Sequence, residues 1–564
     1  MHRVKKCAYL AAVMCALLSS CSGSTSGGTV ASPSAPGVSL TAPALSPGGP
    51  SPIYGTATYE KLEWNSSGLT GRLISPAPPI RYARVELVQN GAAVATATSD
   101  STGYYSFPSV SVTGGVYVRI LSDAVSPYSA TVVDNASATY ALRSSDFTFA
   151  SGQSWKVNLL ASHSDAGNVF NIFDCLIRAQ DVDHLLSGSY PSRVTGVWYQ
   201  GNSGTDYTNG SNTISVYGAS TVAAGGNDAY DDAVVMHETG HYAASNYSRD
   251  NSPGGAHYIN MHYDLRLTWS EGWATFFSAM SRSLRPITGA DYPKWYVDTP
   301  GWLNADGTPL SGTVFAFEID SPSYSSQATG ADNELAVSTV LWHVYASTGS
   351  SLTSPYLGLS DGSIWSTFAT YLPGMTSAIY ATLDRFYDGW NAGHPGQMAS
   401  ILSDRTIRYV ADAYGTHSST GTALTTLTPG TTQTVHNFFP AGAKHYYAIS
   451  VGSGSQYTFA TSSLGDGADT MLTLFDSDGK TMLAQNDDYE ADNDAVTPDN
   501  TYTDGDNDLA SKIVWVANGT KTVYLLCEPY RPYVSSDIYL YTGATGKGVA
   551  KAEYGSYTIS AGSP

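Results

Sequence analysis

The sequence predicts a multidomain α+β protein in which a mixed α/β central domain is flanked by two β-sandwich domains. The chain has 564 residues, which is too long for a single hydrophobic core. Apolar and polar residues alternate in short runs between about 55 and 160 and again beyond about 425, as in half-buried strands. Between these regions, apolar residues recur at helical spacing. We therefore expect domains at 55–160, 165–425 and 426–564.

The N-terminal segment is expected to be an export signal. Arg3, Lys5 and Lys6 precede an apolar stretch at 7–18, which is too short to remain as a membrane-spanning helix. It ends in Leu18-Ser19-Ser20-Cys21, which resembles the lipobox of bacterial lipoproteins. That resemblance implies a signal peptide at 1–21 and a membrane anchor through acylated Cys21. The alternative is an ordinary signal peptide that is cleaved nearby.

Residues 22–54 are mostly Ser, Gly, Pro, Ala, Thr and Val, and they are expected to form a flexible tether. Ser22 follows the lipidated position and, by resemblance to enterobacterial sorting, favours the outer membrane. We expect an exported protein, lipid-anchored in the bacterial cell envelope or released. The net charge of −20 argues against nucleic acid as a partner, and the oligomeric state is left open. Cys175 and Cys527 are expected to be buried free thiols rather than a disulfide.

Both terminal regions carry turn signals between short strands. Val85 and Leu87 precede Asn90-Gly91, which predicts a hairpin. Region 55–160, with "GRLISPAPPIRYARVELV", resembles the carboxypeptidase regulatory-like β-sandwich, which implies a module without chemistry. Strands are expected at 446–451, 457–459, 471–475, 513–516, 523–526 and 557–559. This region, with "DTMLTLFDSDGKTMLAQNDD", resembles the bacterial pre-peptidase C-terminal domain.

In the central region, apolar residues from Val169 to Leu185 predict a helix. Strands are expected at 197–199 and 214–217, and further helices at 231–247 and near 333–347, 365–392 and 396–413. The stretch at 231–247 contains His237-Glu238-Thr239-Gly240-His241, an H-E-x-x-H motif. Residues four apart lie on one face of a helix, so both imidazoles can reach one metal ion.

Two histidines and one further ligand leave a tetrahedral position open for water, which is the arrangement of catalytic zinc. Glu238 is then placed to take a proton from that water. Thirty residues after His241, "WSEGWATFF" places Glu271 on a second apolar helix. This arrangement resembles the gluzincin metallopeptidases, and "EGW" and "DNELAVSTVLWHVY" resemble fungalysin-like enzymes. The resemblance implies His237, His241 and Glu271 as zinc ligands and Glu238 as the general base.

The sequence departs from the gluzincin pattern in three places. Thermolysin-type enzymes usually have an aspartate four residues after the third ligand, where this chain has Thr275. We therefore expect the partner of the first histidine to lie elsewhere, with Asp264 and Asp228 as candidates. No recognisable segment supplies the transition-state donor, for which the candidates are His343, Tyr345, Tyr292, Tyr296 and His257. The exopeptidase motif of zinc aminopeptidases is absent, which favours an endopeptidase.

The C-terminal region is rich in acidic residues, which could bind calcium through carboxylate oxygens or lie in solvated turns. They are Asp466, Asp469, Asp476, Asp478, Asp487, Asp488, Asp504, Asp506 and Asp508. The expected function is hydrolysis of peptide bonds in protein or peptide substrates by a zinc-activated water. The alternative is a catalytically inactive surface adhesin or binding lipoprotein that keeps a protease fold.

Overall fold

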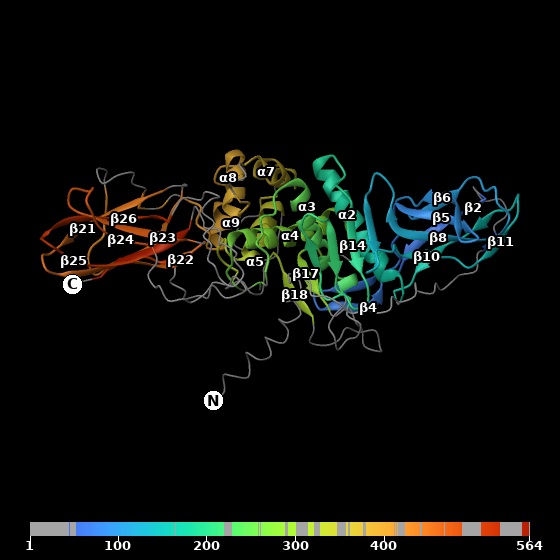
Figure 1. The fold of residues 1–564 in the computed structure, drawn as a ribbon, viewed down its shortest axis with the longest axis horizontal. Coiled ribbons are helices and arrows are strands. Elements are labelled where there is room, and N and C mark those ends of the chain that lie inside the picture. The colour runs from blue at the N-terminus through green and yellow to red at the C-terminus, as the bar shows by residue number, and fades with distance from the viewer. Residues whose placement is uncertain are drawn as a thin grey trace, which may run out of the picture. The chain divides into compact units, whose positions relative to one another are not determined.

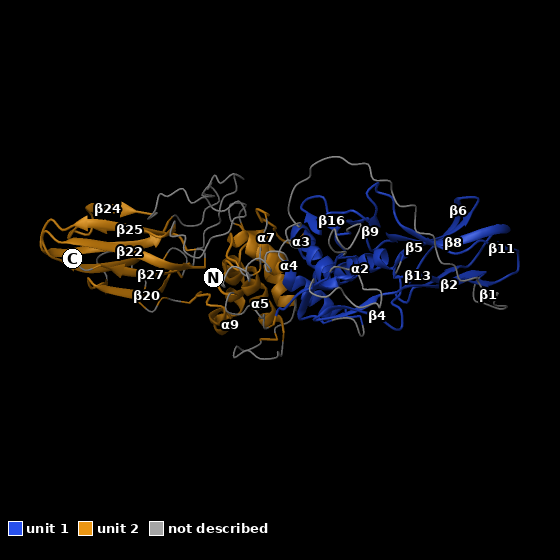
Figure 2. Ribbon diagram, turned by 90° about the horizontal axis from the view of Figure 1, so that it is seen from below, with its two compact units in different colours: residues 1–246, 274–319 blue, residues 247–273, 320–564 orange. Residues whose placement is uncertain are grey.

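The computed structural model forms two compact units, which are described separately (Figures 1 and 2). Unit 1 comprises residues 1–246 and 274–319, and unit 2 comprises 247–273 and 320–564. The described residues are 44–45, 52–163, 165–218, 228–255, 257, 259, 261–287, 292–299, 314–320, 328–346, 357–358, 361–375, 380–410, 412, 414–415, 424–439, 443–466, 468–487, 509–530 and 555–562. The expected signal peptide, Cys21 and most of the expected tether lie outside them.

The N-terminal part of unit 1 consists of short strands. They are β1 Ala44–Leu45, β2 Ile53–Tyr59, β3 Leu62–Asn65, β4 Gly68–Leu73, β5 Ala83–Gln89, β6 Ala92–Thr98, β7 Tyr104–Phe107, β8 Gly114–Ala124, β9 Ala130–Val133, β10 Ala141–Arg143, β11 Phe147–Phe149, β12 Trp155–Lys156 and β13 Leu159–Ala161. The hairpin predicted at Asn90-Gly91 is confirmed, because β5 and β6 pair antiparallel around it. Both turn residues have positive φ, 51° and 80°, as a type I′ turn requires.

The rest of unit 1 adds helices and strands to this β-structure. They are α2 Gly167–Ser187, β14 Val194–Trp198, β15 Asp206–Thr208, β16 Thr213–Val216, the 3₁₀ turn η2 Asp228–Tyr230, α3 Asp232–Tyr247, β17 Trp295–Asp298 and β18 Phe315–Glu318. The long helix predicted from Val169 to Leu185 is confirmed as α2. It is buried along nearly its whole length.

A single sheet joins the two sequence regions of unit 1. Its strand order is β15-β16-β14-β9-β8-β5-β6, and β9 pairs parallel with β14. One hydrophobic core runs from Ile53 on β2 through α2 to Tyr242 on α3. The domain boundary expected at 160–165 therefore lies within one sheet and one hydrophobic core.

Unit 2 begins with part of α4 (Leu265–Leu284), a continuous helix that passes from unit 2 into unit 1 at Trp273. It continues with α5 Glu334–Tyr345, α6 Asp361–Ser366, the π-helical turn η3 Thr367–Tyr371, α7 Leu372–Gly374, α8 Leu383–Gly393 and α9 Ala399–Asp404. The helix predicted near 333–347 is confirmed. The pattern at 365–392 is divided among α6, η3, α7 and α8. Of the described residues within 396–413, those of α9 form the helix.

The C-terminal part of unit 2 is a β-sandwich of two sheets. One has the order β19-β21-β26-β23-β24 and the other β20-β27-β22-β25. The strands are β19 Thr425–Thr426, β20 Thr431–Asn437, β21 His445–Val451, β22 Gln456–Gly465, β23 Thr470–Phe475, β24 Met482–Asn486, β25 Lys512–Val516, β26 Lys521–Pro529 and β27 Ser556–Ala561. All six strands predicted here are confirmed, and the two sheets enclose a core of their own. Strands β19, β20 and β24 were not predicted.

Cys175 and Cys527 are both buried and free, as predicted. Among the described helices, none combines the length and apolarity that a membrane span needs.

Candidate metal centre

Helix α3 carries the H-E-x-x-H motif as a buried helix of unit 1. His237, Glu238 and His241 expose only 8%, 6% and 8% of their surfaces. The two imidazole rings lie edge to face with centroids 5.0 Å apart, as expected for residues one turn apart on the same face. Two neutral imidazoles on one helix face are the donor pair that a zinc ion takes.

The start of α3 is held by a buried ionic network. Asp232, the first residue of the helix, accepts a hydrogen bond from Lys61 Nζ at 2.6 Å and one from Arg178 at 2.8 Å. Asn171 also bonds to both Lys61 and Asp232. These contacts hold the pKa of Asp232 well below its ordinary value, despite the opposing effect of burial. Helix α3 is thereby fixed to α2 and to Lys61, the residue that precedes β3.

Thr275 is the partner of the first histidine, which corrects the sequence-based expectation. Its Oγ1 lies 3.1 Å from His237 Nδ1. Asp264, one of the expected partners, instead caps the start of α4 and makes a two-pronged ion pair with Arg266. Asp228, the other, accepts a hydrogen bond from Thr205. The contact to the first histidine therefore comes from a hydroxyl at position 275 itself, and the presence of this threonine in the sequence was the available signal.

Close packing of α3 against the unit 1 half of α4 sets this contact. A Cβ added to Gly240 would lie 2.6 Å from the Cα of Ala274, a distance that Cβ atoms do not adopt. Glycine between the motif's Thr239 and His241 therefore lets the two helix backbones approach. Thr275, the residue after Ala274, then reaches His237.

Glu271 lies one turn before Thr275 on α4, so the continuous helix sets its position relative to the residue that contacts His237. The ligating atoms of His237, His241 and Glu271 lie within 4.8 Å of one another. Glu271 is buried with 5% of its surface exposed. Two imidazoles and one carboxylate form a donor set that fits Zn²⁺, although the same atoms also accept other first-row divalent ions.

Two of the sequence-predicted donor candidates lie beside these residues. In unit 1, the ring of Tyr296 packs edge to face against His237 at 6.0 Å. Burial, followed by the carboxylates of Asp298 and Glu238, raises the pKa of Tyr296 well above its ordinary value. Its hydroxyl therefore stays protonated and can donate.

In unit 2, His257 joins two glutamates. Its Nε2 lies 3.7 Å from Glu271 Oε2, and its Nδ1 lies 2.7 Å from Glu334 Oε2. These three side chains form a second metal-compatible group that shares Glu271 with the first. The short contact to Glu334 at the start of α5 fixes the imidazole next to the carboxylate of Glu271.

The other donor candidates have different surroundings. His343 is buried on α5, and its Nε2 lies 3.0 Å from the backbone oxygen of Asp320, with burial lowering its pKa. Tyr345 ends α5 and packs its ring against Trp342. Tyr292 packs edge to face on Trp64. A transition-state role for His343 and Tyr345 stays a prediction.

A buried acidic cluster lies at the N-terminal end of α3 and was not predicted. The carboxylates of Asp228, Asp231 and Asp298 approach within 4.8 Å of one another. Asp231 accepts hydrogen bonds from the backbone and hydroxyl of Thr299 at 2.8 and 3.0 Å. Burial raises the pKa of Asp298 to about 7, and burial with the charge of Asp298 raises that of Asp228. The cluster therefore holds protons near neutral pH.

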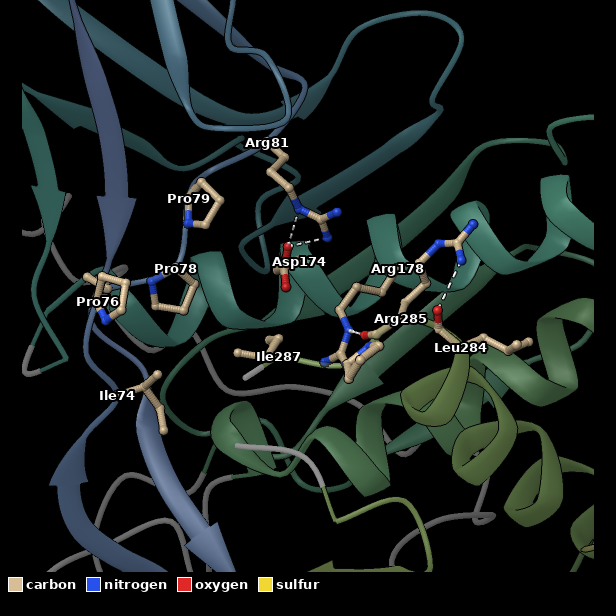
Figure 3. Close-up of a pocket in the computed structure, with 12 residues that line it drawn as sticks. Ile74, Pro76, Pro78, Pro79, Arg81, Asp174, Arg178, Leu284, Arg285 and Ile287 are labelled. Atoms are coloured by element: carbon tan, nitrogen blue, oxygen red, sulfur yellow. Dashed lines mark hydrogen bonds and ion pairs between the residues drawn. The ribbon is translucent and has the colours of Figure 1, made fainter. Parts of the chain in front are cut away.

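Unit 1 also contains a pocket that none of the metal-compatible residues lines. Its volume is about 390 Å³, and Pro76, Pro78 and Pro79 form one wall (Figure 3). Arg81 enters it and binds Asp174 at 2.6 Å, while Arg285 comes from the residue after α4.

The acidic residues of the C-terminal sandwich have protein partners where the structure describes them. Asp476 pairs with Lys521 at 2.6 Å, and Asp478 accepts hydrogen bonds from Thr481 and Lys480 within its turn. Asp466 is buried and accepts the backbone N–H of Ala331. Asp488, Asp504, Asp506 and Asp508 lie outside the described residues. Calcium binding stays a prediction.

No known protein family matches the sequence, and no curated protein is similar to it. Several solved structures resemble about a quarter of the chain. The pre-peptidase C-terminal domain of a collagenase from Bacillus anthracis has 13% identity over 25% of this chain and 94% of its own length, with a TM-score of 0.16.

The surface-associated copper-binding protein CorA of Methylomicrobium album has 10% identity, covers 25% of this chain and 99% of its own length, and gives a TM-score of 0.17. The periplasmic lysozyme inhibitor PliG of Aeromonas hydrophila has 12% identity over 24% of this chain and 96% of its own, with a TM-score of 0.14. These neighbours thus include a pre-peptidase C-terminal domain.

Proposed function

We propose that this protein is a zinc-dependent peptidase, most consistent with an endopeptidase of gluzincin type. The observation that carries the proposal is that the ligating atoms of His237, His241 and Glu271 lie within 4.8 Å of one another. Glu238 lies between the two histidines in the sequence of helix α3. This donor set leaves room for a solvent ligand, which a structural site with four protein ligands does not. Bound zinc would supply Lewis acidity and lower the pKa of that water.

In this proposal some residues orient the metal ligands, and Glu238 acts as the general base. Thr275 orients the ring of His237, and His257 lies beside Glu271, so two of the three proposed ligands have a neighbouring polar group before metal binds. Glu238 is adjacent to His237 on a helix and is not part of the metal-compatible group. Its carboxylate is the base that takes the proton of the attacking water and returns it to the leaving amine.

Tyr296 is the donor we favour for the oxygen that becomes negative as water adds to the scissile carbonyl. Its ring is next to His237, and its hydroxyl remains protonated because burial and nearby carboxylates oppose ionisation. A hydrogen-bond donor aimed at a developing oxyanion typically contributes about 2.7–4 kcal/mol to the transition state. His257 is not our choice for this role, because its two ring nitrogens face Glu271 and Glu334.

The decisive test compares Glu238→Gln with Glu271→Ala in the full-length protein. Glu238→Gln should keep the metal content and lose about a hundred- to ten-thousand-fold in peptide hydrolysis, because only the base is removed. Glu271→Ala removes a ligand, so metal content should fall, and excess zinc should restore part of the activity. Elemental analysis and hydrolysis of a quenched peptide are measured on the same samples.

The same experiment separates the peptidase from an inactive adhesin on a protease fold. An adhesin would show no chelator-sensitive hydrolysis in the parent protein, and Glu238→Gln would change nothing measurable. Full activity of Glu238→Gln, or full metal content and activity of Glu271→Ala, would also remove the assigned roles.

A further inference from the structure

A second group of histidines and a carboxylate lies in unit 2, outside the candidate metal centre. Asp412 follows α9 and precedes the C-terminal sandwich, whereas His436 and His445 belong to β20 and β21. These two strands are in different sheets of the sandwich. The three side chains are all buried, and their ligating atoms lie within 4.8 Å of one another.

We propose that Asp412, His436 and His445 form a second transition-metal site, which binds a divalent ion such as Zn²⁺ and joins both sheets to the segment that enters the sandwich. The donor set of two imidazoles and a carboxylate is one that zinc and other late first-row ions prefer. The site is structural in character because it is enclosed by protein, in contrast to a catalytic site that admits substrate.

The distances between the donors fit a single ion. Asp412 Oδ2 lies 3.0 Å from His436 Nδ1 and 3.6 Å from His445 Nε2. Ligands at about 2.0–2.1 Å from a tetrahedral zinc are about 3.3 Å apart, which lies between these two values. Small side-chain shifts are therefore enough to admit the ion.

The other nitrogen of each imidazole is already held by a second partner. His436 Nε2 lies 3.3 Å from Gln433 Oε1, and His445 Nδ1 lies 2.6 Å from the hydroxyl of Tyr557. Each ring therefore directs its remaining nitrogen at the same carboxylate oxygen. Outer partners of this kind fix the tautomer and orientation of metal-binding histidines.

A fourth ligand is available from the core of the sandwich. The hydroxyl of Tyr447 lies 3.3 Å from His436 Nδ1 and 3.0 Å from the hydroxyl of Tyr557. The backbone N–H groups of Tyr414 and Asn437 also donate hydrogen bonds to the carboxylate of Asp412, at 2.7 and 3.1 Å.

The alternative to a metal site is a purely hydrogen-bonded network of the same atoms, which would bind no metal.

The experiment counts metal ions in the full-length chain after equilibration with zinc and removal of the excess. The parent should hold about two per chain. The double variant His237→Ala/His241→Ala should hold about one, and so should His436→Gln/His445→Gln, which should keep peptide hydrolysis. His394→Gln is the matched control, since His394 packs on Trp390 outside both groups, and it should not change the count.

A second measurement does not depend on altering the sandwich. Zinc added to metal-free His237→Ala/His241→Ala should raise the thermal midpoint of unfolding, and Co²⁺ should give the visible absorption of a four-coordinate site. Adding Asp412→Asn to that variant should lower the zinc affinity at least tenfold, and both effects should shrink accordingly. If His237→Ala/His241→Ala binds no zinc and its thermal midpoint does not respond, the second site is refuted and the hydrogen-bonded network is the correct description. If the parent protein hydrolyses no peptide, the peptidase proposal is refuted, but the second metal site is not affected.

Discussion

Thr275→Val is the substitution that best tests how the first histidine is oriented. Valine has nearly the shape of threonine, so the change removes the hydroxyl 3.1 Å from His237 Nδ1 and little else. His237 remains on the same face of α3 as His241, but its ring loses the contact that fixes its orientation. Metal binding should therefore weaken while the fold is kept.

The size of the effect follows from the contact. A neutral hydrogen bond contributes a net ~0.5–1.5 kcal/mol, and loss of an outer partner of a metal-binding histidine costs about 10–100-fold in metal affinity. One hydrogen bond thus accounts for roughly a tenfold loss, or ~1.4 kcal/mol. Thr275→Asp should act in the opposite direction, because a charged acceptor makes a hydrogen bond about twice as strong.

Competition between the protein and a zinc chelator, with peptide hydrolysis at limiting and excess zinc, measures the change. Thr268→Val is the matched control on the same helix, since its hydroxyl donates to the backbone of Ala331 and touches no proposed ligand. Unchanged zinc affinity in Thr275→Val, or an equal loss in Thr268→Val, would refute the assigned role of Thr275.

Three further predictions concern the surroundings of the sites. Lys61→Met should lower the free energy of unfolding by about 3 kcal/mol in chemical denaturation, because it leaves Asp232 with one fewer buried partner. Gly240→Ala should cost about 1–3 kcal/mol and reduce metal content, because its Cβ would meet the backbone of Ala274. Burial raises the pKa of Asp466 to about 7, so the folded state keeps the proton that the unfolded chain loses above about pH 4. The stability that depends on this proton is complete below about pH 4 and is lost as pH rises to about 7. Asp466→Asn should therefore match the parent at pH 4 and exceed its thermal midpoint at pH 7.5.

The sequence predicted features that depend on short stretches of chain. Asn90-Gly91 specified the hairpin because only a few residues tolerate two consecutive positive φ angles. Helix α2 and the sandwich strands followed from the periodicity of their apolar residues. The spacing of His237 and His241 predicted a shared helix face for the same local reason. Strand β20 was not predicted, because its alternation is interrupted by a bulge between Gln433 and His436.

Contacts between residues that lie far apart in the chain could not be predicted from the spacing of residues in the sequence. Asp412, His436 and His445 show no ligand spacing, because they meet only when two sheets pack together. The acidic cluster similarly joins Asp298 on β17 to the start of α3. Thr275 was misjudged because a hydroxyl was not considered as a substitute for the usual carboxylate.

The shared sheet of unit 1 changes how the role of the N-terminal strands is understood. Resemblance to a regulatory-like module suggested that residues 55–160 are separable from the chemistry. In the structure, β9 from this region pairs with β14 from the next, and their cores are continuous. Lys61, between β2 and β3, neutralises Asp232 at the start of the helix that carries His237. Removing these strands would expose an apolar face of the sheet and leave a buried carboxylate with fewer partners. The N-terminal strands are therefore part of the support on which the candidate metal centre is built.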